Sequence, residues 1–398
     1  MFLIKEIHIF LAMLDLLNKN LRYLFILNFV FGFSVQLITP LFPLYLSEIG
    51  ATASQNALVI SIGSLASTLV MLPSGVLLDK LGRRTLLIGS GVVNMISIFL
   101  MTFTSSWLIA VPVFALYSCS WAFFFPARMA MITSNSESQK RARVFSIMNT
   151  SWPIAGIISP TLSGWLIEST GWNYVFLVGS LVNILGIASG FALSRTDKVD
   201  QEQAGDGVRD ILGDYLPVLT KFFLYGIVIS SALSCVNQII PLYLDQGFAL
   251  SASRIGLFFT VQSFFTLVTQ IPSGALADRF GRKKMMLMYL SFIPFLIGSW
   301  HIFSSWRALL VVNSVAFGLW SMTWPSVLSL LSDSVPDKLV GTVFGLNATG
   351  NRLGMTLGPI VGSFFYVNYF LTSPFLVAAF LFIVAIGVAL TIKEPKHN

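Results

Sequence analysis

The sequence predicts an all-α integral membrane protein in which 12 transmembrane helices form two parallel six-helix repeats. Three observations predict this fold: a composition rich in apolar residues, apolar runs as long as a bilayer is thick, and a loop phrase that occurs twice. Hydrophobic residues make up 55% of the 398 residues and charged residues only 10%, whereas a soluble domain carries about a quarter charged residues. The composition therefore excludes a soluble protein.

The apolar runs predict helices, because a bilayer is crossed by about 20 residues of helix but only about 10 residues of barrel strand. The spans are expected at residues 21–46, 55–78, 84–104, 107–130, 141–167, 172–194, 217–244, 253–277, 284–304, 307–331, 340–366 and 372–392.

Lysines and arginines gather in every second loop, and the opposite loops hold only Arg254 and Arg307. Cytoplasmic loops carry the excess of basic residues, so both termini are expected in the cytoplasm and the chain in the plasma membrane. The expected organisation is an N-terminal cytoplasmic or interfacial segment at 1–20, a six-helix bundle at 21–194, a cytoplasmic linker at 195–216, a second bundle at 217–392 and a cytoplasmic tail at 393–398. An alternative start of synthesis at Met13 stays open.

The loop phrase PSGVLLDKLGRR at 73–84 returns as PSGALADRFGRK at 272–283, so that Gly75 and Gly274 are 199 positions apart. The same offset aligns Trp107 with Trp306, Trp121 with Trp320, Pro126 with Pro325 and Pro160 with Pro359. Matches at one fixed period indicate an internal duplication. Because six spans separate the copies, both enter the membrane from the same side.

The repeated loop resembles the signature of the major facilitator superfamily, which is roughly G-x-L-x-D-x-x-G-R-[RK]. The matching residues are Gly75, Leu77, Asp79, Gly82, Arg83 and Arg84, and again Gly274, Leu276, Asp278, Gly281, Arg282 and Lys283. The resemblance covers the chain after about residue 20. It implies two bundles around a central cavity that opens alternately to each side, with these loops acting as a gate on the cytoplasmic side.

The glycines and acids of the loop have physical reasons to be there. Gly75 and Gly274 are expected to allow a neighbouring helix to approach closely, and Gly82 and Gly281 to permit a left-handed turn as the helix ends. The aspartates can accept hydrogen bonds or pair with the adjacent arginines. The alternative is that the basic residues only anchor the topology.

The predicted spans contain no acidic residue or histidine away from their ends. Catalysis, a metal site and a cofactor site are therefore not expected, and the chain is predicted not to be an enzyme. Many proton-coupled members of the resembled family carry a buried carboxylate in the first, fourth or seventh helix. Here the nearest candidate is Asp333, at the end of a predicted span.

One charge lies deep in a predicted span, at Arg352. Such a charge usually faces a cavity or a partner, so Arg352 is either a substrate contact that favours anionic groups or a structural donor to a neighbouring carbonyl. Gly354, Gly358 and Gly362 follow at intervals of four, which predicts a stripe for tight helix packing.

The resemblance also implies which helices line the cavity. Their polar and aromatic residues are Gln36, Tyr117, Trp121, Asn149, Trp152, Asn237, Gln238, Gln262, Trp320, Trp324, Asn351 and Arg352. Aromatic rings with a few amides suit an amphipathic, partly aromatic solute. The alternative for each aromatic residue is ordinary packing.

Three functions remain open. The first is a secondary transporter that exports hydrophobic or amphipathic compounds, resembling the multidrug-efflux antiporters. The second is uptake or exchange of an organic anion or polar metabolite at Arg352, and the third is a membrane sensor of the same fold that does not transport. The expected partners are a small-molecule substrate, membrane lipid, and protons or another coupling ion, with no nucleic acid and no second copy of the chain.

Overall fold

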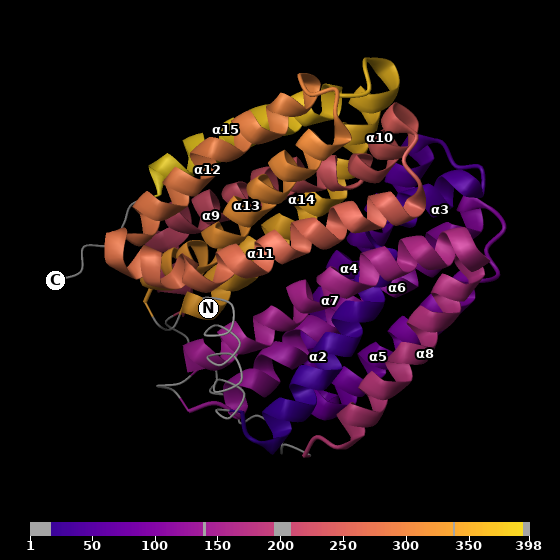
Figure 1. Ribbon diagram of the computed structural model, residues 1–398. Coiled ribbons are helices and arrows are strands. Elements are labelled where there is room, and N and C mark those ends of the chain that lie inside the picture. Colours follow the sequence, from indigo (N-terminus) through magenta and orange to yellow (C-terminus); the bar gives the residue numbers. More distant parts are fainter. Residues whose placement is uncertain (1–16, 138–140, 195–207, 337–338, 393–398) are drawn as a thin grey trace, which may run out of the picture. The chain divides into compact units, whose positions relative to one another are not determined.

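The computed structural model describes residues 17–137, 141–194, 208–336 and 339–392, which are almost wholly helical (Figure 1). The helices of the first half are α2 (Lys19–Ile38), α3 (Phe42–Glu48), α4 (Ala53–Leu81), α5 (Arg83–Met101), α6 (Trp107–Ser134), α7 (Arg141–Thr170) and α8 (Trp172–Phe191). The helices of the second half are α9 (Val208–Asn237), α10 (Ile239–Phe248), α11 (Ala252–Phe280), α12 (Arg282–Gly298), α13 (Trp306–Asp333), α14 (Val340–Asn368) and α15 (Ser373–Thr391), with a short 3₁₀ turn η1 (Ser299–His301) after α12.

Ten predicted spans each coincide with one helix, and the first and seventh each coincide with two consecutive helices, so the expectation of a helical membrane protein is confirmed. Within the described residues, eight helical stretches are long and apolar enough to cross a membrane by length and composition alone: Lys19–Ile38, Ala53–Met71, Arg83–Met101, Trp107–Ser134, Trp172–Phe191, Tyr215–Phe248, Trp306–Asp333 and Ser373–Thr391. The other four predicted spans correspond to α7, α11, α12 and α14.

The segments expected outside the bundles fall mostly outside the described residues, at positions 1–16, 195–207 and 393–398. One boundary differs from the expectation, because α9 begins at Val208, inside the predicted linker. At the other end of the chain α2 is capped by Asn18, whose side chain accepts a hydrogen bond from the backbone N–H of Leu21 at 2.9 Å.

The first and seventh predicted spans are broken, which the sequence prediction missed. The first is interrupted between α2 and α3 and the seventh at Gln238, between α9 and α10. A proline at position i cannot donate to the carbonyl at i−4 and its ring clashes with that carbonyl. Pro43 and Pro241 therefore cannot bond to Thr39 and Asn237. α2 ends at Ile38, directly before Thr39, and α9 ends at Asn237.

The described chain divides into two compact units that do not follow the predicted bundles throughout. The first unit comprises Met1–Tyr45, Ala66–Asp200 and Ala252–Thr260, and the second comprises Leu46–Leu65, Gln201–Ser251 and Val261–Asn398. The start of α11 belongs to the first unit because it lies directly on α7. There Glu168 accepts hydrogen bonds from the backbone N–H and the hydroxyl of Ser253 at 2.8 and 2.6 Å.

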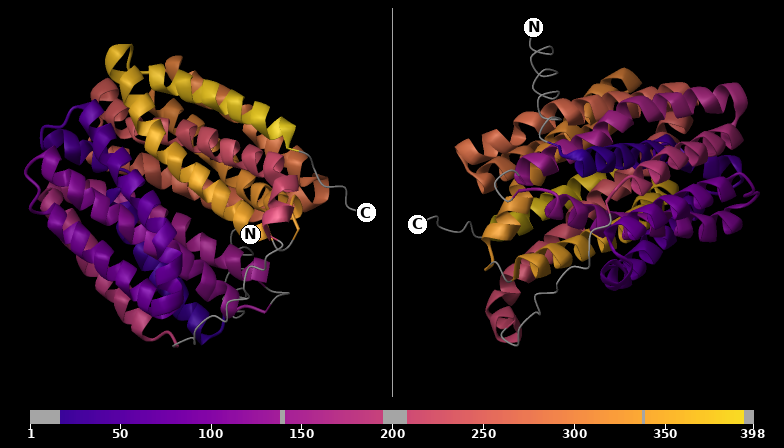
Figure 2. Two further views of the ribbon diagram at one scale, coloured as in Figure 1. Left: turned by 180° about the vertical axis from the view of Figure 1, so that it is seen from behind. Right: turned by 90° about the horizontal axis from the view of Figure 1, so that it is seen from below.

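Each half of the chain is built from the same set of helix pairs, which Figures 1 and 2 show from three directions. In the first half α2 packs on α7 and α8, and α5 packs on α6 and α8. In the second half α9 packs on α14 and α15, and α12 packs on α13 and α15. These are equivalent pairs under the sequence offset, so the duplication is present in the packing as well.

The closest of these contacts is the seam between α9 and α14. A Cβ added at Gly350, Gly354 or Gly358 would overlap atoms of α9, and one added at Gly362 would lie 2.5 Å from the carbonyl oxygen of Cys235. These glycines therefore let two backbones touch, and the predicted small-residue stripe on α14 is confirmed.

The loop glycines differ from the stripe among the described residues. A Cβ added at Gly75 or Gly274 meets no described atom within 4 Å. Among the described residues, therefore, neither glycine has the close helix neighbour that the sequence analysis expected.

Candidate functional site

A cluster of aromatic rings lies between α2, α6 and α7 in the first unit. The Trp121 and Trp152 rings stack with centroids 4.6 Å apart and planes at 28°. Phe31 meets the Trp121 ring edge-on at 5.6 Å and stacks on Phe124 at 4.0 Å. Both phenylalanines are fully buried, but the two indoles are only partly buried. The structure thus brings together two residues that the sequence predicted to line a cavity.

Two other predicted lining residues belong to the same unit. Tyr117 is buried, and its hydroxyl bonds to the Thr39 hydroxyl at 3.0 Å, beside the break between α2 and α3. Gln36 lies one turn earlier on α2 and is partly buried. Tyr117 therefore ties α6 to the broken end of α2.

Asn149, also predicted to line the cavity, is bonded to a charged residue that the prediction left out. The Arg128 guanidinium donates from Nη2 to the Asn149 side-chain oxygen at 2.7 Å. Only 4% of Arg128 is exposed, and its Nε–H has no hydrogen-bond partner among the described residues. A buried arginine held by a neutral amide is a poorly compensated cation.

In the second unit Asn351 is part of a polar chain across the seam. It donates to Asn347 at 3.1 Å and accepts from Ser230 of α9 at 2.9 Å, while Asn347 donates to the carbonyl of Phe222 at 3.0 Å. These bonds satisfy the amides within the bundle, which is a structural use of Asn351. Arg352, next to it, is partly buried in α14.

The remaining predicted residues of the second unit are spread over three helices. Gln262 of α11 accepts a hydrogen bond from Asn313 at 2.7 Å. Trp320 and Trp324 of α13 meet edge-on at 6.0 Å, and Trp324 is 42% exposed. Asn237 is exposed. The structure brings the two tryptophans together but does not join them to the glutamine.

Gln238 is the most unusual of these residues because it sits at the helix break. It is 5% exposed, and neither its side-chain oxygen nor its side-chain nitrogen has a hydrogen-bond partner in the described part of the chain. Leaving a buried amide unpaired costs about 1–3 kcal/mol. A polar group that binds there would recover this free energy.

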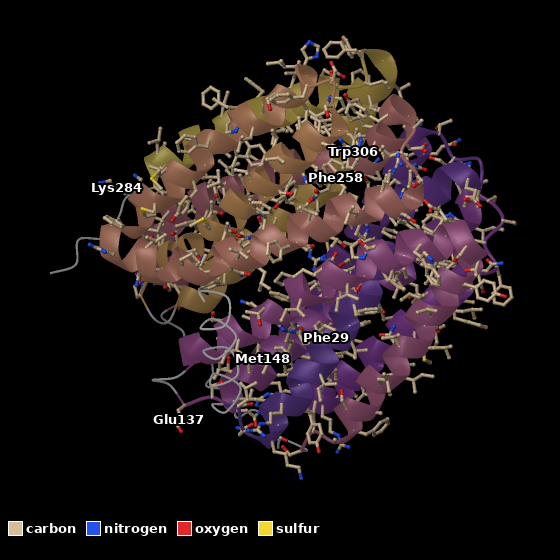
Figure 3. The ribbon with its side chains drawn as sticks, viewed as in Figure 1. Phe29, Glu137, Met148, Phe258, Lys284 and Trp306 are labelled. Atoms are coloured by element: carbon tan, nitrogen blue, oxygen red, sulfur yellow. The ribbon has the colours of Figure 1, made fainter. Side chains whose placement is uncertain are left out.

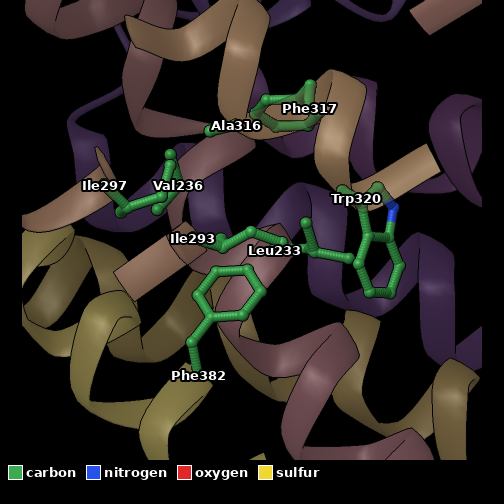
Figure 4. A pocket seen from close by; sticks show the side chains of 8 residues that line it. All are labelled: Leu233, Val236, Ile293, Ile297, Ala316, Phe317, Trp320 and Phe382. Atoms are coloured by element: carbon green, nitrogen blue, oxygen red, sulfur yellow. The ribbon is translucent and has the colours of Figure 1, made fainter. Parts of the chain in front are cut away.

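A small apolar cavity lies in the second unit and is lined by Leu233, Val236, Ile293, Ile297, Ala316, Phe317, Trp320 and Phe382 (Figure 4). Its volume of about 10 Å³ is at the lower limit for holding one water molecule. Because its wall is apolar and its volume is far below that of a ligand site, we interpret this cavity as a packing gap.

The repeated loop turns as expected at its second glycine. Gly82 has φ of +82° and Gly281 has φ of +96°, and each separates two helices. Only glycine adopts this region freely, so the turn requires glycine. The side chains of Asp79 and Asp278 lie outside the described part of the structure, and their roles stay predictions.

The basic residue two positions after the second glycine of each loop, Arg84 or Lys283, caps the sixth predicted span of its own half. Arg84 donates to the carbonyls of Gly190 and Phe191 at the end of α8, the first at 3.3 Å. Its equivalent, Lys283, donates to Leu390 at 2.9 Å and to Ile392 at 2.6 Å, at the end of α15. A cation at a helix C-terminus satisfies the last carbonyls and offsets the negative end of the helix dipole.

We predict that Lys283→Ala lowers the free energy of unfolding by about 1 kcal/mol, because the end of α15 loses its cap. Thermal unfolding in detergent should then show a Tm lower by roughly 2–4 °C. Lys284→Ala is the matched control, since Lys284 is exposed at the same end of α12 (Figure 3). An equal drop in Tm for both variants would mean that capping is not the cause.

The arginine directly after the second glycine of each loop, Arg83 or Arg282, behaves differently in the two halves. Arg282 forms an ion pair with Asp333, the last residue of α13. The equivalent of Arg282 is Arg83, but the position equivalent to Asp333 is Ser134, and the Nε–H of Arg83 has no hydrogen-bond partner among the described residues. Asp333, proposed from sequence as the nearest proton site, is thus paired with a cation, and its use as a proton site stays a prediction.

Comparison with known proteins identifies the family. The sequence model described as Major Facilitator Superfamily matches residues 24–234 and 222–398, which together are most of the chain. The chain belongs to the major facilitator superfamily. Its expected fold and its predicted place among transporters rather than enzymes are therefore confirmed.

Two relatives of this superfamily chain carry informative names. It is 25% identical to "Multi-drug resistance efflux pump PmrA" of Streptococcus pneumoniae serotype 4 (strain ATCC BAA-334 / TIGR4), with 87% of this chain and 89% of the relative covered. It is 23% identical to "Multidrug resistance protein 2" of Bacillus subtilis (strain 168), with 93% and 94% covered.

Two solved structures share the superfamily fold. The bacterial homologue of the human lysosomal transporter Spinster has a TM-score of 0.74 at 13% identity, covering 93% of this chain and 95% of that one. A mutant of the nucleoside transporter NupG has a TM-score of 0.76 at 14% identity, covering 94% and 100%. At these identities the likeness shows the fold alone.

For this superfamily member, sequence reasoning missed Arg128, Thr39 and Asn313 as partners of predicted residues. Arg128 was visible as the lone charge before the end of a predicted span, and it lies 21 positions before Asn149. Helical periodicity cannot relate two residues at this separation, because they lie on different helices. Only the packing of α6 against α7 shows that they meet.

Proposed function

We propose that the chain is a secondary active transporter that exports hydrophobic or amphipathic small molecules by alternating access. The observation that carries this proposal is the partly buried, stacked pair of Trp121 and Trp152, which offers a flat apolar surface inside a membrane bundle. Aromatic rings bind such solutes through area and stacking rather than through a fixed set of hydrogen bonds. The relative named as a multi-drug resistance efflux pump supports the same direction of transport.

The proposal includes a plasma-membrane location with both termini in the cytoplasm, and a monomeric protein. The alternation of basic loops supports the topology. A gradient of protons or another ion would drive transport. The ion pair at Asp333 makes this carboxylate a group that could exchange its arginine for a proton during the cycle.

The test is transport in proteoliposomes of the purified full-length chain, with amphipathic dyes of both charges compared with small polar metabolites. We expect an imposed pH gradient or another ion gradient to drive dye movement. Exchange of polar metabolites with no movement of any amphipathic dye would overturn the export of hydrophobic compounds.

We further expect Asp79→Asn and Asp278→Asn to slow transport at least tenfold and to leave ligand affinity within about twofold. The reason is that a gate changes the rate between two conformations, whereas the binding residues lie elsewhere. Initial rates in proteoliposomes and binding in detergent measure the two effects separately. Equal losses of binding and transport would show that these loops are not gates.

A further inference from the structure

Arg128 differs from the other basic residues near helix ends because its side chain does not extend to the solvent. It lies six positions before Ser134, the last residue of α6, a distance of about 9 Å along the helix. A long side chain so placed would normally extend to the interface. Here its exposed fraction is 4%, and its bond runs sideways to Asn149 of α7. The charge is therefore held inside the bundle.

The bundle does not need an arginine at this place, and the duplication shows it. Because Pro126 aligns with Pro325, the equivalent of Arg128 is Val327, which is 7% exposed in α13. Because Val144 aligns with Val343, the equivalent of Asn149 is Ala348. The second half thus builds the same helix pair with a valine and an alanine. The Arg128–Asn149 pair is an addition to the fold.

Within the described ranges, Arg128 donates one hydrogen bond to Asn149, and its buried Nε–H makes none. A guanidinium has five N–H donors and a full positive charge, whereas Asn149 supplies one neutral acceptor. Removing a charge from water without an opposite charge costs several kcal/mol. A bound carboxylate or sulfonate would supply both the missing charge and the missing acceptor.

The stacked indoles lie along the same contact between α6 and α7 as the Arg128 cation. Arg128 is seven residues after Trp121 on α6, which is two turns and about 10 Å along one face. Asn149 is three residues before Trp152 on α7, and therefore close to the same face. The flat apolar pair and the buried cation thus follow one another along the α6–α7 contact.

We propose that Arg128, Asn149, Trp121 and Trp152 form a binding site for amphipathic aromatic anions, in which the acid group pairs with Arg128 and the ring lies on the indoles. The inference rests on the proposed function and narrows its substrate class. It assigns a ligand contact to Arg128, and it gives the first unit a charge preference that its aromatic residues alone would not have.

The test is binding of two probes with the same ring and opposite charge, 2-naphthalenesulfonate and 2-naphthylmethylammonium, to the purified full-length protein in detergent. The wild type should bind the sulfonate more tightly. Arg128→Gln should weaken sulfonate binding at least tenfold and change ammonium binding less than twofold. Arg307→Gln is the control, since it also removes one arginine charge, at the start of α13.

A second variant guards against misfolding. Arg128→Val with Asn149→Ala copies the residues of the second half at both positions, so no buried amide is left without its partner. It should keep the wild-type Tm and lose the sulfonate preference. Unchanged sulfonate affinity in this folded variant would overturn the inference, as would loss of the preference in Arg352→Gln but not in Arg128→Gln.

The result also separates this inference from the proposed function. Arg128-dependent sulfonate binding without any dye movement in proteoliposomes would refute export and leave the anion site standing. Dye export with tighter binding of the ammonium than of the sulfonate would refute the anion site and leave export standing.

Discussion

Gly354→Ala is expected to destabilise the protein by about 3 kcal/mol, the largest effect of any single methyl group that we predict here. The added Cβ would overlap the carbonyl oxygen of Ile227, and the next atoms it meets are Ser230 Cβ and the backbone nitrogen of Ser231, both at 2.8 Å. Two of these three atoms belong to the backbone of α9, so no side-chain rotation can relieve the overlap. The two helices would have to move apart along the seam.

The matched control is Gly345→Ala on the same helix. A Cβ at Gly345 meets no described atom within 4 Å. Alanine also favours a helix over glycine by up to about 1 kcal/mol, so this variant should be neutral or more stable. Thermal unfolding of both variants in the same detergent measures the difference. Similar Tm values would mean that α9 and α14 do not touch along their backbones in solution.

Charge reversal at the Arg282–Asp333 ion pair is expected to give the second large effect. Arg282 begins α12 and Asp333 ends α13, so each charge sits at the end of its helix where the dipole disfavours it. Their pairing compensates for this. Asp333→Arg would place two cations together and Arg282→Asp two anions, and each should cost about 1–3 kcal/mol.

The double variant Arg282→Asp with Asp333→Arg should recover all of this loss and become at least as stable as the wild type. The pair is restored, and both charges now sit at favourable helix ends. Unfolding of the four proteins forms a double-mutant cycle that isolates the coupling. If the losses of the single variants simply add in the double variant, the pair makes no contribution to stability.

The helices and their duplication were predictable because a bilayer imposes a long, continuous apolar signal. An apolar run such as 372–392 can be interpreted only as a transmembrane helix. The offset that aligns Trp121 with Trp320 can be found by comparing the sequence with itself. The stripe of Gly354, Gly358 and Gly362 was equally clear, since small residues at intervals of four serve helix contact.

The breaks after Ile38 and Asn237 were harder to predict, because Pro43 and Pro241 lie in segments that remain apolar throughout. Transmembrane helices often tolerate proline in their interior, and α6 continues through Pro112 and Pro126. Whether a helix bends or breaks depends on what its neighbours bond to the freed carbonyl. These bonds depend on the tertiary structure and cannot be predicted from the local sequence.

Interactions between helices were beyond the sequence for the same reason. The cap that Lys283 gives to α15 joins residues 107 and 109 positions apart. Only one of the two roles of these basic residues could therefore be predicted. The sequence indicated on which side of the membrane they lie, but it did not indicate that they donate hydrogen bonds to a helix end.

The contrast between α9 and α10 has a mechanical consequence. From Phe222 to Cys235, the backbone of α9 contacts the backbone of α14 and accepts a hydrogen bond from a side-chain amide of α14. This part of α9 therefore moves with α14 as one rigid unit. Beyond the break, Gln246 of α10 is tethered to Tyr366 through side chains at 2.8 Å, and these can rotate about single bonds. A force on α10 is therefore expected to bend the chain at Gln238, the residue that separates α9 from α10.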